Sequence, residues 1–295
     1  MKTAVLIANP LARKYSEKIF HRWVIYLEKI GFSVESHRLD RNQEVGEIIA
    51  KLDHRLVSLV VLMAGDGTIN SALNAMVLRE DRDLFNFTLV PSGTANILCK
   101  ELGVDSLRKS MEAVQRGRIK RLHMGRLIVN PGPRESRRYF SLMVSCGFDS
   151  RAVNTVNAGL KKKIGGLAYV YEFLKILFRG NFQELRTEVD GIVYRNILTC
   201  VSNGKYYGAK IQTTESCLEN NSFDVVIIKK ISFLSAMFYF FTRKNNKNII
   251  RLAEKNNVTI AADAERCPLQ IDGDCYCDLP VRVESSDKYI NIHYL

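Results

Sequence analysis

The sequence has no long hydrophobic run among its 295 residues. The longest candidate, residues 231–241, includes two serines and is well short of the ~20 apolar residues that cross a bilayer. The segment Met1–Pro10 lacks the long apolar core and cleavage site of a secretory signal peptide, and it favours a short strand followed by a turn. We therefore expect a cytoplasmic protein that does not span a membrane.

The seven cysteines include no C-x-x-C pair, and their odd number leaves one without a disulfide partner. This usage is typical of reduced thiols in a cytosol. Cys275 and Cys277 alternate as residues of a strand do, so we expect both thiols to point to one face. A redox or metal role for this pair stays open, although no histidine is nearby in the sequence.

Acidic residues are the minority, since 31 Asp and Glu against 43 Lys and Arg give a formal net charge of +12. This balance favours acidic partners. The basic residues follow no nucleic-acid-binding motif, so we expect no nucleic acid. They gather in residues 161–163 and 229–255, and the second group flanks the aromatic stretch Phe233–Phe241. This arrangement favours a peripheral position on the anionic inner membrane surface, with a core-packing helix as the alternative. The sequence leaves a homodimer open.

Length and composition, with 46% apolar and 25% charged residues, indicate an ordinary globular protein large enough for two domains. Residues 1–125 alternate apolar strands with amphipathic helices, as a Rossmann-like α/β nucleotide-binding domain does. Residues 126–288 show the alternation typical of antiparallel sheet, with Asp190-Gly191 as a hairpin turn. Residues 289–295 are expected to form a strand that returns to the first domain.

The expected elements of the first domain are strands at residues 4–8, 32–38, 59–63 and 87–90 and helices at residues 16–30, 44–52, 69–78, 97–103 and 106–115. A glycine-rich turn, Ala64–Thr68, follows the third strand and opens a helix. Glycines permit close backbone approach, and the N–H groups of such a turn can line a phosphate site. Asp66 in this turn can hold a cation bridging to the phosphates. A tight turn with a helix cap is the alternative for this segment alone.

A second glycine-rich turn, Pro91–Asn96, follows the fourth strand and precedes a helix-like segment. Parallel strands bring their carboxyl ends to one sheet edge, so the two turns can line a single crevice. Their coincidence favours phosphate binding over two unrelated tight turns.

Together the turns resemble those of the diacylglycerol kinase catalytic-domain family, which includes bacterial lipid kinases and sphingosine kinases. The family's first motif is Gly-Gly-Asp-Gly-Thr, with Ala64 here in place of its first glycine, and Pro91–Asn96 matches the second motif throughout. Later family motifs agree in order and spacing at Cys146–Asp149, Lys161–Tyr169, Ser202–Gly208 and Ile271–Asp274.

The resemblance implies a Rossmann-like nucleotide domain, a C-terminal β-sandwich domain for the lipid substrate, and an active site in the cleft between them. It also implies transfer of the γ-phosphoryl group of ATP to a lipid hydroxyl, of diacylglycerol or a similar lipid, with Mg²⁺ as the ion. Carried over by position, the nucleotide site consists of Asn9, Gly65, Asp66, Gly67, Thr68, Asn70, Ser92, Gly93, Thr94 and Asn96. A nucleotide-contacting threonine of the family has no counterpart near Leu39 or Asp40.

The family's Asp-Gly-Glu motif appears here as Asp272-Gly273-Asp274, which shortens the carboxylate of the general base by one methylene. The loss of reach is about 1.5 Å, whereas a base must lie within ~2.6–3.2 Å of its proton donor or act through one water. Asp274 is therefore expected to be a catalytic base of reduced efficiency, with Asp66 as the alternative base. A further interpretation makes Asp272-Gly273 a hairpin turn and Asp274 a solvated strand residue.

A second departure concerns a family segment that holds a structural Mg²⁺ in several bacterial lipid kinases. It appears here as Leu218–Asp224, with Asn220 in place of a ligand aspartate. An amide oxygen binds a cation without charge, so the affinity should be lower. The expected metal ligands are thus Asp66 and, for a weaker second site, Asn220, with Glu219 and Asp224 as substitutes.

Two other functions stay open. NAD kinases share the first glycine-rich turn, but the Asn-Glu pair that follows it in them is Asn70-Ser71 here. A catalytically weak nucleotide- or lipid-binding protein is the contrasting class, and the changes at Asp274 and Asn220 favour it. The sequence does not identify the lipid headgroup or chain.

Overall fold

The computed structural model describes residues 2–40, 43–132, 135–147, 182–207, 211–212, 214–230, 242, 244–263 and 267–295. The chain divides into two compact units, Met1–His123 with Lys288–Leu295 and Met124–Asp287. Among the described residues, no helix has the length and hydropathy of a membrane span. Lys161–Tyr169 and Phe233–Phe241, which the sequence singles out, lie outside the described residues, as do Phe148, Asp149 and Gly208.

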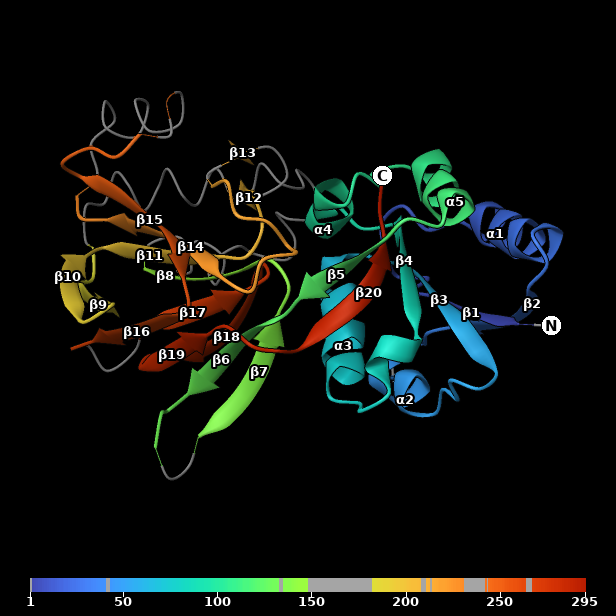
Figure 1. The fold of residues 1–295 in the computed structure, drawn as a ribbon, viewed down its shortest axis with the longest axis horizontal. Coiled ribbons are helices and arrows are strands. Elements are labelled where there is room, and N and C mark those ends of the chain that lie inside the picture. Colours follow the sequence, from blue (N-terminus) through green and yellow to red (C-terminus); the bar gives the residue numbers. More distant parts are fainter. Residues whose placement is uncertain are drawn as a thin grey trace. The chain divides into compact units, whose positions relative to one another are not determined.

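The first unit is built on a six-stranded sheet in the order β2-β1-β3-β4-β20-β5 (Figure 1). The strands β1 to β4 are parallel, and β20 pairs in parallel with β4 and antiparallel with β5. The strands are β1 (Thr3–Ala8), β2 (Ser33–Arg38), β3 (Val57–Ala64), β4 (Asn86–Pro91), β5 (Ile119–His123) and β20 (Tyr289–His293). The Rossmann-like α/β architecture expected from the alternating pattern is confirmed, and the last strand of the chain belongs to this sheet.

Helices cover both faces of this sheet, with α1 and α5 on one face and α2 and α3 on the other (Figure 1). The described helices are α1 (Glu17–Lys29), α2 (Val45–Ala50), α3 (Asp66–Val77), α4 (Ile97–Glu101), α5 (Leu107–Arg116) and the 3₁₀ turn η1 (Arg82–Leu84). Their ends follow the sequence signals. Ser16 Oγ accepts a hydrogen bond from Ile19 N and caps α1, and Gly31 ends that helix with a φ of +94°.

The second unit contains two six-stranded antiparallel sheets, in the orders β10-β9-β16-β19-β6-β7 and β15-β14-β11-β8-β17-β18. The strands of the first are β10 (Ile192–Asn196), β9 (Leu185–Val189), β16 (Asn257–Ala262), β19 (Val281–Glu284), β6 (Gly125–Val129) and β7 (Ser136–Phe140). Those of the second are β15 (Ile249–Lys255), β14 (Phe223–Ile228), β11 (Leu198–Ser202), β8 (Met143–Gly147), β17 (Pro268–Ile271) and β18 (Asp274–Asp278). A short pair, β12 (Tyr206–Tyr207) with β13 (Ile211–Gln212), stands apart.

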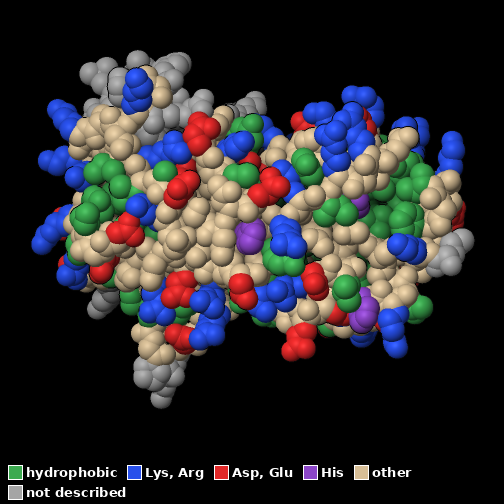
Figure 2. Space-filling model, viewed as in Figure 1, with side chains coloured by type: hydrophobic (Ala, Val, Ile, Leu, Met, Phe, Trp, Pro, Cys, Tyr) green, Lys and Arg blue, Asp and Glu red, His purple; other side chains and the backbone are tan. Residues whose placement is uncertain are grey.

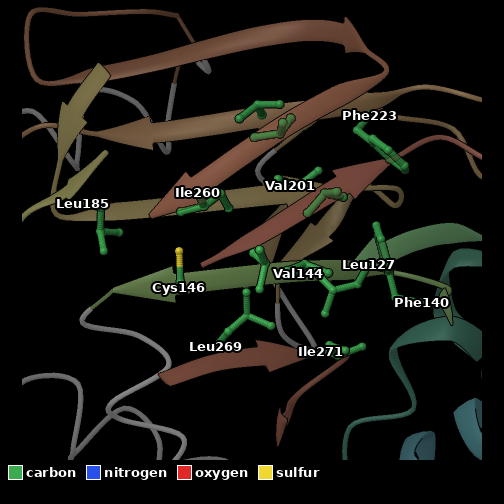
Figure 3. Packing of buried hydrophobic residues seen from close by; sticks show 14 of the residues in the cluster. Leu127, Phe140, Val144, Cys146, Leu185, Val201, Phe223, Ile260, Leu269 and Ile271 are labelled. Carbon is green, nitrogen blue, oxygen red and sulfur yellow. The ribbon is translucent and has the colours of Figure 1, made fainter. Parts of the chain in front are cut away.

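Apolar side chains from both sheets form a shared core cluster in this unit (Figure 3). Leu127, Phe140 and Ile260 come from the first sheet, and Val201 and Leu269 come from the second. Alternate residues of each strand point inward, as facing sheets require. The β-sandwich that the family resemblance implies is therefore confirmed.

The hairpin predicted at Asp190-Gly191 is confirmed, since both residues have positive φ and join paired strands β9 and β10. The prediction that Cys275 and Cys277 share a face is wrong. A register shift in the β17–β18 pair sets Cys277 opposite Leu269 and Cys275 opposite the next residue of β17. Because adjacent strand residues face opposite sides, the two thiols do as well. Cys277 packs on the core, whereas Cys275 is exposed.

Candidate functional site

Three neighbouring strands of the first unit end at one edge of the sheet, because β1, β3 and β4 are parallel and adjacent. Backbone hydrogen bonds tie the segments that follow them together. Asn9 N donates to Met63 O at 3.0 Å, and Lys14 N donates to Ser92 O at 2.8 Å. The two glycine-rich turns and the loop after β1 therefore form one connected group at this edge.

The first turn passes directly into α3, which begins at Asp66 and not at Ile69 as the sequence suggested. Gly65 is the residue before the helix and provides no side-chain cap. The first intrahelical bond runs from Ile69 N to Gly65 O. In an α-helix the amides of the first turn have no intrahelical acceptor, so those of Gly67 and Thr68 are available to an anion.

The two turns meet at their glycines. A Cβ placed on Gly93 would lie 2.6 Å from the Cα of Gly65 and 2.9 Å from Asn96 Oδ1. A Cβ placed on Gly65 would lie 3.1 Å from the Cα of Gly93. Only glycine at position 93 permits this backbone contact, so the second glycine-rich motif is required to bring the two turns together.

Asp66 connects the turns with its carboxylate. Its Oδ2 accepts a hydrogen bond from Asn96 N and its Oδ1 accepts one from Ile97 N, both at 2.8 Å. The carboxylate therefore caps α4 although it belongs to α3, and it places negative charge at the positive end of that helix. Burial raises the pKa of Asp66, while these amides act in the opposite direction.

Asn96 closes the second turn on itself. It has left-handed backbone angles, with φ of +51°. Its Oδ1 accepts a hydrogen bond from Gly93 N at 2.8 Å, and its Nδ2 donates to Gly93 O at 3.1 Å. Asparagine tolerates this backbone region, and its short amide satisfies both backbone groups of the glycine.

The loop after β1 joins the first turn through side chains. Asn9 Nδ2 donates to Thr68 Oγ1 at 2.9 Å, while Asn9 Oδ1 accepts from Leu11 N at 2.9 Å. Asn70 is buried and accepts a hydrogen bond from Asn74 Nδ2 within α3. Among the other expected nucleotide residues, Ser92 is buried and Thr94 is exposed.

Asp66 is the carboxylate of this site that suits a metal. Mg²⁺ at a nucleotide is held mostly by phosphate oxygens and water, with one or two carboxylates from the protein. Asp66 supplies one such carboxylate, whose oxygens also accept hydrogen bonds from the amides of Asn96 and Ile97. The donor set therefore fits a nucleotide-bound ion. In the part of the chain that the structure describes, no group of three or more acidic, His or Cys side chains forms a metal cage.

In the second unit, Asp274 is the first residue of β18 and is exposed. The two-residue turn before it consists of Asp272 and Gly273, which have φ of +49° and +93°. Positive φ at both central residues is the hairpin geometry that favours Asp-Gly. The hairpin expected as one interpretation is thus present, and Asp274 follows it on the edge strand of its sheet.

Asp272 itself is not a solvated turn residue. Its buried carboxylate accepts hydrogen bonds from Ser141 N, Ser141 Oγ, Leu142 N and Met143 N at 2.8–3.0 Å. Burial raises the pKa of Asp272, against the lowering by these donors. No local sequence signal indicates this role, because the donors lie about 130 positions earlier in the chain.

The residues considered for a second metal site do not converge as a ligand set. Asn220 is exposed, and its backbone N donates to Cys217 O in a turn. Asp224 is buried and pairs with Arg251 at 2.8 Å, and it also accepts from Glu215 N. The Arg251 guanidinium neutralises the negative charge of Asp224 that would otherwise attract a metal cation. Asp224 is therefore an ion-pair residue in this structure.

Replacing Gly93 with alanine should reduce nucleotide binding and the stability of the first unit, because the added Cβ overlaps backbone at 2.6 Å. Overpacking of this kind costs about 1–3 kcal/mol. Gly46→Ala is the matched control, since a Cβ there would lie 3.6 Å from Ala75 Cβ in ordinary contact. Thermal unfolding and nucleotide binding measured on both variants check this. Equal behaviour of the two would show that the turns do not need their close approach.

Comparison with known proteins follows the two units. A model of the diacylglycerol kinase catalytic domain matches residues 3–127, and a model of the YegS C-terminal NAD kinase beta sandwich-like domain matches residues 142–294. The diacylglycerol kinase of Bacillus subtilis (strain 168) is 23% identical over 304 residues, which cover 99% of this chain and 96% of that protein. A probable lipid kinase YegS of Salmonella arizonae is 26% identical over 199 residues, 66% of this chain and 64% of that protein.

Solved structures share the fold. A putative diacylglycerol kinase from Bacillus anthracis str. Sterne matches with a TM-score of 0.80 at 17% identity, over 100% of this chain and 98% of that one. Yeast NADH kinase complexed with NADH matches with a TM-score of 0.56 at 12% identity, over 100% of this chain and 84% of that one. The two-unit architecture is therefore common to kinases of lipids and of dinucleotides.

Proposed function

The chain belongs to the diacylglycerol kinase catalytic-domain family and is a lipid kinase, and we propose that it transfers the γ-phosphoryl group of ATP to a hydroxyl of diacylglycerol or a similar lipid. The observation that carries this proposal is the contact between the two glycine-rich turns through Gly65, Gly93 and the Asp66 carboxylate. It creates a rigid backbone surface with amides at a helix start, which suits a polyphosphate.

The turns and the loop after β1 bind the nucleotide in this proposal. The amides of Gly67 and Thr68 donate to phosphate oxygens, and Asn9 keeps the Thr68 hydroxyl in place through its 2.9 Å hydrogen bond. Asp66 would hold Mg²⁺, which would neutralise charge on the phosphates. Because Asp66 is itself fixed by two amides, it keeps its position without substrate-induced ordering.

Asp274 accepts the proton of the lipid hydroxyl as the phosphoryl group arrives. Its exposure agrees with a group that must meet a substrate, and the hairpin directly before it fixes the backbone. A carboxylate can take this proton only at hydrogen-bond distance from the hydroxyl, or through one water. The shorter side chain of Asp274 makes this distance the limiting requirement of the proposed reaction.

The direct test incubates the pure protein with labelled ATP, Mg²⁺ and anionic mixed micelles that contain one candidate lipid at a time. The panel includes diacylglycerol, a sphingoid base and phosphatidylglycerol, and a parallel reaction contains NAD in place of lipid. We expect label in a lipid product that depends on Mg²⁺. Label in NAD alone would favour the NAD kinase alternative, and ATP binding without any product would favour a binding protein.

The membrane is the proposed location of the lipid substrate, and the net charge of +12 supports an anionic surface. Figure 2 shows Lys and Arg side chains spread over the displayed face, with acidic side chains among them. Attraction to anionic lipid therefore depends on many basic residues. Among those beside the aromatic stretch, Lys244 and Lys247 are described and exposed.

Binding to anionic vesicles should be strong at low salt and should fall as salt rises, because the Debye length is about 10 Å at 0.1 M. Each basic residue near such a surface contributes about 1 kcal/mol. The double change Lys244→Gln with Lys247→Gln should weaken sedimentation with vesicles, whereas Lys18→Gln with Lys51→Gln, two exposed residues of the first unit, serves as the charge-matched control. Equal binding to neutral vesicles at every salt concentration would contradict the electrostatic proposal.

A further inference from the structure

The Asp272 carboxylate joins two connections of the β-sandwich unit. Residues Ser141 and Leu142 link β7 to β8, and these strands belong to different sheets. Ser141, Leu142 and Met143 donate four hydrogen bonds to the carboxylate. In return, Asp272 N donates to Met143 O at 2.9 Å. The hairpin that carries Asp272 is thereby fastened to the point where the chain crosses between sheets.

A third loop donates hydrogen bonds to the backbone carbonyl groups of the same crossing. Asn203, directly after β11, donates from its Nδ2 to Ser141 O at 2.8 Å and from its backbone N to Leu142 O at 2.7 Å. Gly204 O in turn accepts hydrogen bonds from Ser202 Oγ and Thr214 Oγ1. The amides of the crossing donate to the Asp272 carboxylate and its carbonyls accept from Asn203, so hydrogen bonds hold its backbone on both sides.

This arrangement determines where β18 begins. Ile271 is the last residue of β17 and pairs with Asp274 across the two-residue turn. The buried Asp272 side chain leaves the turn toward the crossing, and the exposed Asp274 follows two residues later. Asp274 lies on β18, which among the described strands is the edge of its sheet and pairs with β17 alone. Asp272 is therefore the anchor nearest to Asp274 in the chain.

We propose that Asp272 is a positioning residue, which fixes the start of β18 so that the short Asp274 side chain reaches the lipid hydroxyl. This inference rests on the proposed function, in which Asp274 is the base. A glutamate has an additional methylene with which to adjust its reach, whereas an aspartate depends more strongly on the backbone that carries it. Displacement of a reacting group by about 1 Å costs on the order of 10²-fold in rate.

Asp272→Asn is the informative change because it keeps the shape of the side chain. The amide oxygen still accepts hydrogen bonds, but the new NH₂ group faces backbone N–H donors where the second carboxylate oxygen was bonded. The side chain loses its negative charge, and its NH₂ group meets a backbone N–H that can no longer donate to it. Both changes should weaken the hydrogen bonds that hold the hairpin. We expect kcat to fall by ~10- to 100-fold while KM for ATP changes by less than about twofold, since the residues assigned to ATP belong to the other unit.

A double-mutant cycle separates positioning from general destabilisation. The native protein, Asp272→Asn, Asp274→Asn and the double variant are compared in kcat for the same lipid in anionic micelles. If Asp272 acts through Asp274, the double variant should be no slower than Asp274→Asn alone. Ser141→Ala, which removes only the 3.0 Å bond from Ser141 Oγ, should show the same dependence with a smaller effect and serves if Asp272→Asn does not fold.

Asn196→Asp is the matched control. Asn196 is buried at the opposite end of β11 from Asn203, and its side chain bonds Thr187 and Thr199. The change also exchanges an amide and a carboxylate within a buried cluster, so it should lower stability and leave kcat nearly unchanged at a temperature where the protein is folded. Labelling of the half-buried Cys277 thiol, which packs on the core, should be faster in Asp272→Asn than in the native protein, and unchanged in Asn196→Asp.

The outcomes are distinct. A greater loss of kcat in the double variant than in Asp274→Asn would overturn the positioning role alone. A loss of kcat in Asn196→Asp equal to that in Asp272→Asn would do the same. Full activity of Asp274→Asn would overturn the assignment of the base, and the positioning role with it. A loss in both single variants without further loss in the double variant, together with faster Cys277 labelling, is the result we expect.

Discussion

Asp66→Asn should abolish phosphoryl transfer, with a loss of ~10³-fold or more in kcat/KM, because one side chain supplies both the metal-binding charge and the link between the phosphate turns. Removal of a single electrostatic contact to a reacting group typically costs about 10²–10³-fold. In this protein the same change also disturbs the turns, since the new NH₂ group would face the amide of Asn96 or Ile97.

The structure predicts a second effect of this variant that the sequence alone does not. Asp66 caps α4, so its replacement should lower the free energy of unfolding of the first unit by about 0.5–2 kcal/mol, the usual cost of losing a cap. Thermal unfolding, nucleotide binding and turnover are measured on the same preparation, at a temperature where the variant is folded. The loss of activity should far exceed what the unfolded fraction explains.

Asp81→Asn is the control for the loss of stability. Asp81 pairs with Arg79 at 2.7 Å and with His54 at 2.9 Å, in the same unit but outside the phosphate turns. It should unfold at a lower temperature and keep its kcat. If Asp66→Asn retained full activity, Asp66 would be a structural cap alone, and the metal and base roles would both be wrong.

The sequence predicts the first unit well because its signals are local. Buried parallel strands appear as apolar runs such as Leu59–Met63, and Ser16 and Gly31 mark the two ends of α1. The glycine-rich turns were placed correctly for the same reason. Their contact at Gly65 and Gly93 was not predictable in detail, because it depends on the distance between two neighbouring strands.

The second unit shows where local signals fail. Asp272-Gly273 is an ordinary hairpin signal, and nothing near it in the sequence indicates four donors from residues 141–143. The β-bulge beside Cys275 is likewise not visible in the local sequence. It arises from the pairing of β18 with β17, and it turns the Cys275 thiol to the face opposite that of Cys277. Both the buried Asp272 carboxylate and the face of the Cys275 thiol are determined by contacts with other strands and loops, and not by the residues next to them in the sequence.

The proposed reaction depends on the reach of the Asp274 carboxylate, and side-chain length tests this requirement directly. Asp274→Glu should raise turnover, because the added methylene restores about 1.5 Å of reach to a base that must come within ~2.6–3.2 Å of the hydroxyl. Asp274→Asn should lower turnover by the ~10²–10⁴-fold typical of lost acid–base catalysis. Neither change should alter the fold, because Asp274 is exposed on an edge strand.

The order of activities distinguishes three mechanisms. If Asp274 is the base, turnover falls from the Glu variant through the native protein to the Asn variant. If Asp66 is the base, both changes at Asp274 are mild and Asp66→Asn alone is inactive. If the protein only binds its ligands, neither the native protein nor the Glu variant turns over any lipid of the panel or NAD, although ATP still binds. Single-turnover measurements keep product release from masking the proton transfer, so the comparison reports the step in which the carboxylate length matters.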